Sequence, residues 1–198
     1  MKKNLLRLSC YILLLAFTSC SSCKKNEPPK PEDTLPPATQ TGANTFGCVI
    51  NGQAWIPNGV STIPVIKPIY GGYLAENIGR PKYTFNIRTN SDRNSLELYV
   101  RSVVSPGRYQ LAFDTGIFGT LSPKNYGLYS IDGATTDDPD YDYITTSQIT
   151  GYVDFTVADT LNKRAAGTFE FDAIDNPSGK TIKITGGRFD INQKTLNP

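Results

Sequence analysis

The chain has 198 residues, of which 38% are hydrophobic and 11% aromatic, and this suits one globular domain with a tail. Its 20 basic and 18 acidic residues give a formal net charge of +2, and no run of lysine or arginine forms the basic patch that nucleic acid requires, so we expect no nucleic-acid partner. The absence of histidine excludes Ser-His-Asp triads, Cys-His pairs and most zinc sites.

The N-terminus has the pattern of a secretory signal peptide. Two lysines precede an apolar run from Tyr11 to Phe17, and small residues and cysteines follow it. The run is shorter than the roughly 20 apolar residues that a membrane-spanning helix needs. Phe17-Thr18-Ser19-Cys20 resembles the lipobox of bacterial lipoproteins, in which the cysteine becomes the first mature residue and carries the lipid. We expect residues 1–19 to be removed and Cys20 to be acylated, with Cys23 as the alternative lipidation site.

Residues 20–43 have the composition of a spacer. Five prolines lie among charged and polar residues between Lys24 and Ala43, and such a segment cannot bury enough apolar surface to fold. The composition predicts an extended, disordered linker that joins the lipid to a single domain over residues 44–198.

From Thr45 onward, apolar residues recur at every second position, which is the period of a half-buried β-strand. Phe46, Cys48 and Ile50 alternate up to Asn51-Gly52, the commonest two-residue hairpin turn. We interpret Cys48 as a small core residue because it shares a face with its two apolar neighbours. The predicted strands cover 46–50, 53–56, 82–88, 96–101, 107–112, 126–131, 152–157, 168–172 and 182–189.

This pattern predicts an all-β domain of roughly eight to ten antiparallel strands. Two irregular stretches, from Pro57 to Arg80 and from Asp114 to Lys124, favour a β-sandwich with decorated ends. The alternative is a lipocalin-like β-barrel, which would enclose a cavity for a small lipophilic ligand.

An acidic segment runs from Thr135 to Tyr143. Asp138, Asp140 and Asp142 place carboxylates at alternate positions, as calcium loops do, and they are candidate calcium ligands. The segment departs from an EF-hand loop because no glycine follows Asp142 and no glutamate closes it. A solvated turn is the alternative, since proline and aspartate are typical turn residues.

Two tyrosines in this segment, Tyr141 and Tyr143, are candidate ligand-binding residues. Exposed tyrosines can stack on sugar rings and also donate hydrogen bonds. The alternative is a purely structural role, because tyrosine is common at strand edges.

Several acidic residues alternate with core residues in the predicted strands. We interpret these residues as solvated groups on outer faces: Glu97, Asp154, Glu170 and Asp172. Glycoside cleavage requires two carboxylates in one cleft, and nothing in the sequence brings two together. No catalytic residue is predicted.

Several motifs together resemble small lipoproteins common in Bacteroidota. They are the lipobox, the proline-rich linker, Phe-x-x-x-Ile-Asn-Gly-x-x-Trp over Phe46–Trp55, and a C-terminal run with Ala-Gly-Thr-Phe-Glu-Phe from Ala166 and Ile-Thr-Gly-Gly-Arg-Phe-Asp from Ile184. The resemblance implies an outer-membrane lipoprotein on the periplasmic or the surface side, without an assigned activity and without catalytic residues to carry over.

We therefore expect a non-catalytic, lipid-anchored envelope protein whose β domain binds or scaffolds a glycan or a protein partner. A carboxylate-dependent polysaccharide hydrolase and a barrel-type carrier of a lipophilic ligand are the alternatives. No cofactor is expected apart from calcium at the acidic segment.

Overall fold

The computed structural model describes residues 28–61, 65–79, 81–113, 124–133, 135 and 137–196 of the chain. The predicted signal peptide and both candidate lipidation cysteines, Cys20 and Cys23, lie outside these ranges. The elements are η1 (Pro31–Thr34), β1 (Thr45–Ile50), β2 (Gln53–Trp55), β3 (Ile69–Tyr73), β4 (Phe85–Ser91), β5 (Asn94–Val100), β6 (Gly107–Leu111), β7 (Tyr126–Ile131), β8 (Tyr141–Ile144), β9 (Gly151–Asp159), β10 (Arg164–Ile174), β11 (Thr181–Asn192) and α2 (Gln193–Leu196).

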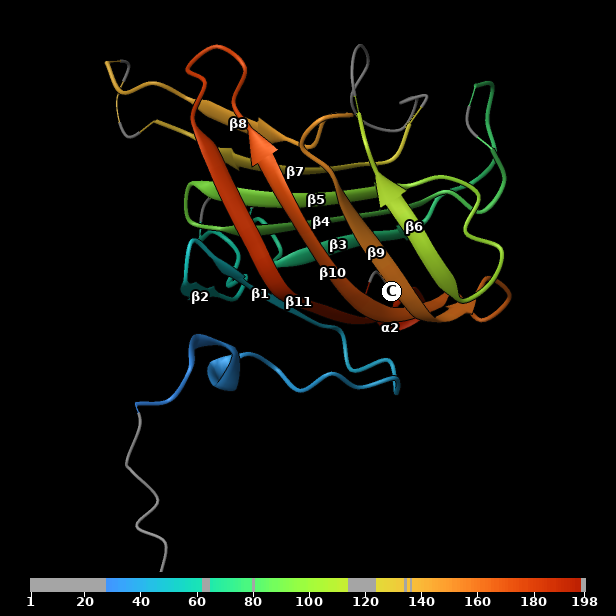
Figure 1. The fold of residues 1–198 in the computed structure, drawn as a ribbon. Coiled ribbons are helices and arrows are strands. Elements are labelled where there is room, and N and C mark those ends of the chain that lie inside the picture. Colours follow the sequence, from blue (N-terminus) through green and yellow to red (C-terminus); the bar gives the residue numbers. More distant parts are fainter. Residues whose placement is uncertain are drawn as a thin grey trace, which may run out of the picture.

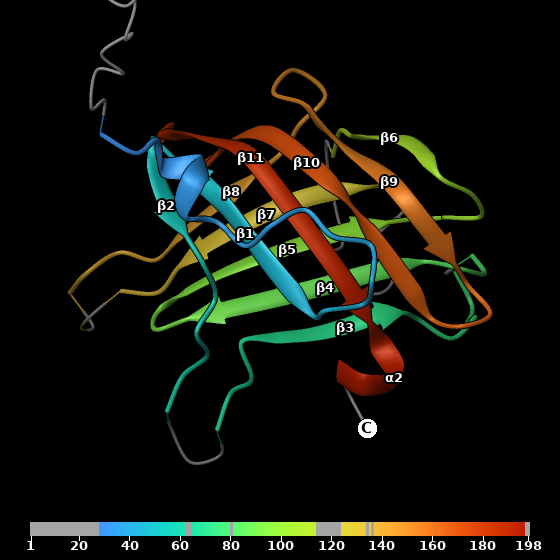
Figure 2. The same cartoon turned by 90° about the horizontal axis from the view of Figure 1, so that it is seen from below.

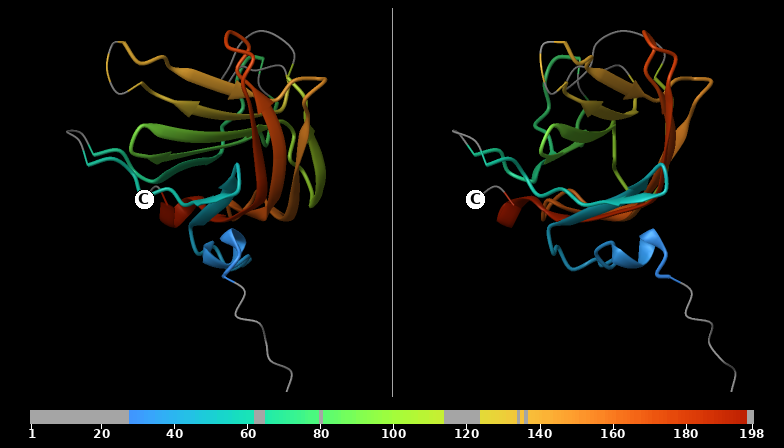
Figure 3. Two further views of the ribbon diagram at one scale, coloured as in Figure 1. Left: turned by 60° about the vertical axis from the view of Figure 1, so that its left-hand side comes forward. Right: turned by 90° about the vertical axis from the view of Figure 1, so that its left-hand side faces the viewer.

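The eleven strands form one antiparallel sheet, which confirms the all-β prediction. The order along the sheet is β2-β1-β11-β10-β8-β7-β5-β4-β3, while β9 pairs with β10 and with β6. The sheet is strongly curled into a half-barrel (Figure 1, Figure 3). It differs from the favoured sandwich, because its two halves belong to one hydrogen-bonded sheet.

Strand β10 joins those two halves. Its residues Arg164–Phe171 pair with β9, whereas Ile174 at its end pairs with Ile144 of β8. We call β2, β1, β11, β10, β9 and β6 the β11 arm, and β8, β7, β5, β4 and β3 the β5 arm. Figure 2 shows the strands of the two arms crossing each other.

The core lies between the two arms and is rich in aromatic rings. Phe85 of β4 contacts Phe155 of β9 and Phe189 of β11, with ring centroids 5.3 and 5.6 Å apart. Trp55 of β2 meets Tyr129 of β7 at 6.2 Å. These rings occupy the space that a barrel-type carrier would keep for its ligand.

Local sequence explains the hairpins. Asn51 and Gly52 both have positive φ, 48° and 81°, as the type I′ turn between β1 and β2 requires. The meander of β9, β10 and β11 follows the predicted alternation. Cys48 is fully buried, which confirms its interpretation as a core residue.

Strand β3 lies within a stretch that the sequence predicts to be irregular. Its Gly71 and Gly72 have φ of 113° and 128°, a region that glycine alone adopts easily. A Cβ on Gly71 would lie 2.3 Å from the backbone oxygen of Asn86 on β4. This edge strand therefore depends on glycine, which the alternation of apolar residues does not reveal.

The N-terminal segment 31–43 packs along the outside of β1 and β11, and we call it the strap (Figure 2). Leu35 is buried, and a Cβ on Gly47 of β1 would lie 3.3 Å from its side chain. Asp190 of β11 accepts hydrogen bonds from the backbone N–H groups of Thr41, Gly42 and Ala43. The structure thus differs from the expected free spacer over this segment.

Among the described residues, no helix is both long enough and apolar enough to cross a membrane.

Candidate functional site

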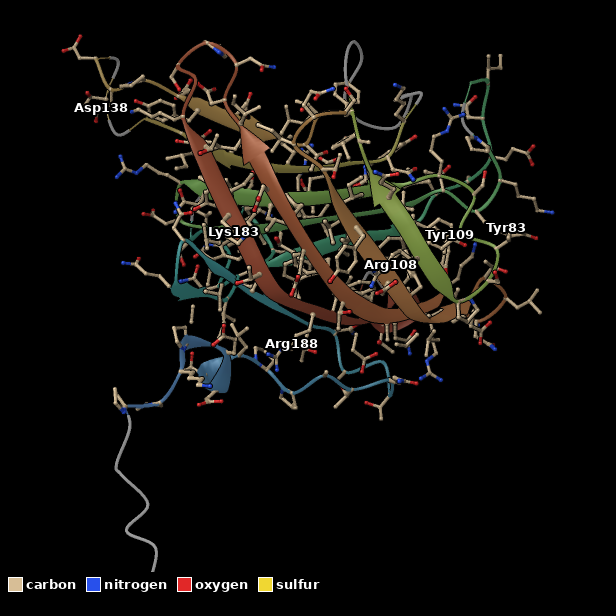
Figure 4. All side chains as sticks on the ribbon, viewed as in Figure 1. Tyr83, Arg108, Tyr109, Asp138, Lys183 and Arg188 are labelled. Atoms are coloured by element: carbon tan, nitrogen blue, oxygen red, sulfur yellow. The ribbon has the colours of Figure 1, made fainter. Side chains whose placement is uncertain are left out.

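The outer face of the β11 arm carries the polar residues that alternate with the core. The strand register places Arg108 of β6 opposite Asp154 of β9, and Glu170 of β10 opposite Tyr152 of β9. Asp172 of β10 lies opposite Lys183 of β11. Side chains from four strands therefore gather on one face, and Figure 4 shows Arg108 and Lys183 over this arm.

A depression of about 560 Å³ lies at the centre of this face, and we call it the central cavity. Its lining is Arg108, Gln110, Thr150, Gly151, Tyr152, Glu170, Phe171, Asp172, Lys183, Ile184 and Thr185. Gly151 keeps β9 close to β10 here, because a Cβ at this position would lie 2.1 Å from the Cβ of Phe171. The volume falls in the range of small-molecule sites.

Tyr152 is the aromatic centre of the cavity. Its hydroxyl donates to Glu170 Oε2 at 3.2 Å, and the Arg108 guanidinium lies 3.8 Å from the ring centroid. Burial raises the pKa of Tyr152, and the hydrogen bond with Glu170 raises it further, so the hydroxyl remains a neutral donor. Arg108 in turn donates from Nε to both oxygens of Asp154, at 3.0 and 3.1 Å.

Both cations of the cavity are paired with a carboxylate, and the remaining carboxylate, Glu170, accepts a hydrogen bond from Tyr152. The hydrogen bond from Arg108 lowers the pKa of Asp154, which therefore stays ionised. Lys183 Nζ lies 3.2 Å from Asp172 Oδ1. Both ion pairs are partly exposed, so their contribution to stability is small. Their main effect is to offer hydrogen-bond donors and acceptors in which each positive charge is matched by a negative one.

Two further depressions continue the central cavity along β10 and β11. The lower one, about 340 Å³, shares Tyr152 and Glu170 with it and extends to Arg188 and to Ala38 of the strap. The upper one, about 260 Å³, shares Asp172 and Lys183 and extends to Thr181 and Asn51. We call the three together the outer groove.

The candidate calcium ligands do not meet in one site. Asp140 Oδ1 accepts from the N–H of Gly133 at 2.7 Å, and Asp142 Oδ1 accepts from the hydroxyl of Ser130 at 2.6 Å. Asp138 lies at the tip of the β7–β8 hairpin, far from the outer groove (Figure 4). In the part of the chain that the structure describes, no three His, Cys, Asp or Glu side chains are grouped as metal ligands.

The two tyrosines of this segment have different surroundings. Tyr143 is only 6% exposed and belongs to the core, because it faces inward from β8. Tyr141 is half-buried and lines a separate cavity of about 320 Å³ together with Asp138 and Asp92. Its ring stacks on Tyr143 at 5.9 Å, and Lys180 Nζ lies 4.3 Å from its centroid. The two rings therefore do not form one exposed stacking surface.

The interpretation of Glu97 as a solvated residue is wrong. Its side chain is buried and accepts hydrogen bonds from Asn86, Arg88 and Tyr126. A second small core covers the outer face of the β5 arm here, with Tyr99 stacked on Tyr126 at 5.2 Å. The carboxylate is enclosed by its partners, and we assign it a structural role.

The outer groove was not anticipated as a site from the sequence. Asp154, Glu170 and Asp172 were expected to face outward, and they do, but Tyr152, Arg108 and Lys183 were not grouped with them. The turn length between β10 and β11 could have indicated that Asp172 lies opposite Lys183. The pairing of Glu170 with Tyr152 depends on a register shift between Ala166 and Gly167, which the turn lengths do not reveal.

Comparisons of this chain with models of protein families, with curated protein sequences and with solved structures give no match.

Proposed function

We propose that this chain is a non-catalytic, lipid-anchored envelope protein whose β domain binds a glycan in the outer groove. One observation carries the proposal: a half-buried tyrosine, Tyr152, lies among paired charges and hydroxyl groups in a cavity of about 560 Å³. Sugar hydroxyls each need a donor and an acceptor, and the cavity offers both kinds of group on a pre-formed sheet face.

A glycan fits this surface better than a protein partner does. Protein interfaces have an apolar, aromatic centre from which charged residues are depleted. In the central cavity, the apolar residues Phe171 and Ile184 are 2% and 1% exposed, and their side chains belong to the core. Most of the other lining residues are polar, among them Gln110, Thr150 and Thr185.

A carboxylate-dependent hydrolase is the second candidate function. Glu170 and Asp172 stand two residues apart on β10 and line the same cavity, with Cα atoms about 7 Å apart for a strand of this geometry. Two carboxylates in one cavity are what glycoside cleavage requires. However, Asp172 is paired with Lys183, and Glu170 is solvent-exposed rather than enclosed by the apolar surroundings that a general acid needs. Binding without cleavage is therefore the better-supported function.

The strap limits the distance between the domain and the membrane. If Cys20 carries the lipid, only about ten residues separate it from η1, and ten residues span at most about 35 Å. A spacer running free to Ala43 would reach about twice as far. The proposed protein would therefore hold its domain close to the outer membrane, on the periplasmic or the surface side.

The test is a glycan array probed with the chain from residue 20 to Pro198 carrying Cys20→Ser and Cys23→Ser, which is the expected mature protein without its lipid. We expect selective binding that Tyr152→Ala abolishes. Tyr141→Ala is the matched control, because Tyr141 lines the separate cavity, and it should leave binding intact. An array without a hit would refute the glycan proposal.

The same preparation separates binding from cleavage. The proposed function predicts that an array hit, incubated with the protein overnight, is recovered at its original length. Shortened products that disappear with Glu170→Gln would instead establish the hydrolase.

A further inference from the structure

We propose that the outer groove binds a linear, uncharged polysaccharide, with at least three consecutive sugar units lying along β10 and β11. This inference rests on the proposed function and adds the shape and charge of the ligand. It follows from two features of the groove: its continuity and its charge balance.

The three cavities form one continuous path. Tyr152 and Glu170 line both the lower and the central cavity, and Asp172 and Lys183 line both the central and the upper one. Along β11 the path runs from Thr181 to Arg188, and seven strand steps cover roughly 23 Å. A single sugar would fill one cavity and leave the other two unused, whereas a chain engages all three.

The charge balance disfavours an ionic ligand. Arg108 and Lys183 are paired with Asp154 and Asp172. The remaining carboxylate, Glu170, lines the lower cavity together with Arg188, so the charges of the outer groove sum to zero and favour neither a carboxylated nor a cationic sugar. Arg188 in the lower cavity donates to the backbone oxygens of Pro36 and Glu32, both at 3.4 Å. Its guanidinium therefore holds the strap in place.

The two ends of the groove differ. The upper cavity ends at the β1–β2 turn, where Asn51 accepts from the N–H of Lys183 at 2.9 Å and so lies along the edge of β11. At the lower end, Ala38 of the strap lines the cavity, and beyond Arg188 the strap covers Asp190, which is 2% exposed and accepts hydrogen bonds from N–H groups of the strap. The groove therefore runs from the β1–β2 turn to the strap, and this length limits how many sugar units it can contact.

The experiment measures the length dependence of binding. Cello-, xylo-, manno- and malto-oligosaccharides of one to six units are titrated into the Cys20→Ser, Cys23→Ser chain by isothermal calorimetry. We expect the affinity in at least one series to rise at least about tenfold from the monosaccharide to the trisaccharide, because each added unit enters a further cavity.

Variants at the two ends of the groove locate the chain. Thr181→Ala lies in the upper cavity and Thr168→Ala in the lower one, and both side chains are exposed, so these variants should fold normally. Each should weaken binding of the hexasaccharide several-fold and leave disaccharide binding in the central cavity unchanged. Tyr152→Ala should weaken both.

The outcomes separate this inference from the proposed function. An affinity that is already maximal for a monosaccharide or disaccharide, or array hits restricted to branched or charged glycans, would overturn the linear-chain inference and leave glycan binding standing. If the array gives no hit and none of the four hexasaccharides binds, both proposals are refuted.

Discussion

Replacement of Asp190 by asparagine should loosen the strap and destabilise the domain. In the structure, Asp190 Oδ2 accepts from Thr39 Oγ1 at 2.7 Å, from Thr41 N at 2.9 Å and from Ala43 N at 3.2 Å, while Oδ1 accepts from Gly42 N at 2.8 Å. An asparagine can direct its one oxygen to only one of these groups of donors. Its amide NH₂ then faces N–H groups that no longer have an acceptor.

The magnitude follows from the number of donors. Hydrogen bonds to a charged group contribute about 1.5–3 kcal/mol each when removed alone, and one buried donor without a partner costs about 1–3 kcal/mol. Contributions within one network are not additive, so we expect Asp190→Asn to lower the free energy of unfolding by about 2–4 kcal/mol in total. For a domain of this size, that corresponds to a fall in Tm of about 5–15 °C.

The assay is urea unfolding at pH 7, followed by the fluorescence of Trp55, the single tryptophan of the chain. Its ring packs edge-on against Phe46 at 6.4 Å, so its emission reports on the core. Asp92→Asn is the matched control, because Asp92 lies in the exposed turn between β4 and β5 with φ of 50°, a conformation that asparagine tolerates. The control should change the free energy of unfolding by less than about 0.5 kcal/mol.

The pH dependence provides an independent check. Burial alone would raise the pKa of Asp190, but the hydrogen bonds from Thr39, Ala43, Gly42 and Thr41 outweigh it and lower the pKa below the ordinary value. The stabilisation is therefore complete above about pH 4, the range of an unfolded aspartate, and is lost as the pH falls through the lower folded-state value. The gap between wild type and Asp190→Asn should narrow below pH 4. Equal urea midpoints at pH 7, or a gap that stays constant on acidification, would refute this reasoning.

Two further predictions concern buried groups and one concerns the surface. Tyr126→Phe removes a buried hydroxyl that donates to Glu97 at 2.7 Å, and it should lower the free energy of unfolding in urea by about 1–3 kcal/mol. An unchanged free energy would show that the hydrogen bonds from Arg88 and Asn86 are enough to stabilise the buried Glu97 carboxylate. Cys48 should react with a thiol reagent only as the domain unfolds, because its side chain is fully buried and burial raises the pKa of the thiol; rapid labelling of the native protein would contradict its place in the core. Arg108→Ala should leave the urea midpoint nearly unchanged, since the Arg108 side chain is 61% exposed, and a clear fall in the midpoint would mean that the ion pair with Asp154 supports the sheet.

The sequence predicted the strands that obey simple alternation. Phe46, Cys48 and Ile50 all belong to or pack against the core, as their alternate spacing indicates, and the Asn51-Gly52 turn forms the expected hairpin. Strand β3 was missed because Gly71 and Gly72 provide neither an apolar pattern nor β propensity; its pairing with β4 is a long-range contact.

The single curled sheet could not be predicted from local patterns. It depends on β10, which is long enough to pair with β9 along its first part and with β8 at Ile174. When one strand pairs with two different neighbouring strands along its length, its inward and outward side chains alternate as in any other strand. The choice between a sandwich and a barrel was therefore open in the sequence.

Candidate site residues can be chosen from the sequence only by local composition, and this criterion does not find residues that come together from distant strands. The segment with Asp138, Asp140 and Tyr141 concentrates charge and rings over a few consecutive positions, whereas the lining of the central cavity comes mainly from four different strands. Glu97 was misplaced because alternation gives the face of a residue but not what covers that face. The strap was misjudged because its anchor, Asp190, lies far along the sequence.

The central claim is that the outer face of β9, β10 and β11 is a glycan-binding groove. Its most direct test is an NMR titration of the ¹⁵N-labelled chain from residue 20 to Pro198, carrying Cys20→Ser and Cys23→Ser, with the tightest-binding hexasaccharide of the length series. The account predicts that the backbone amide shifts change most at Tyr152, Glu170 and Lys183 and extend toward Thr181 and Arg188. Shift changes centred on the β7–β8 hairpin around Tyr141, or none at saturating hexasaccharide, would contradict it.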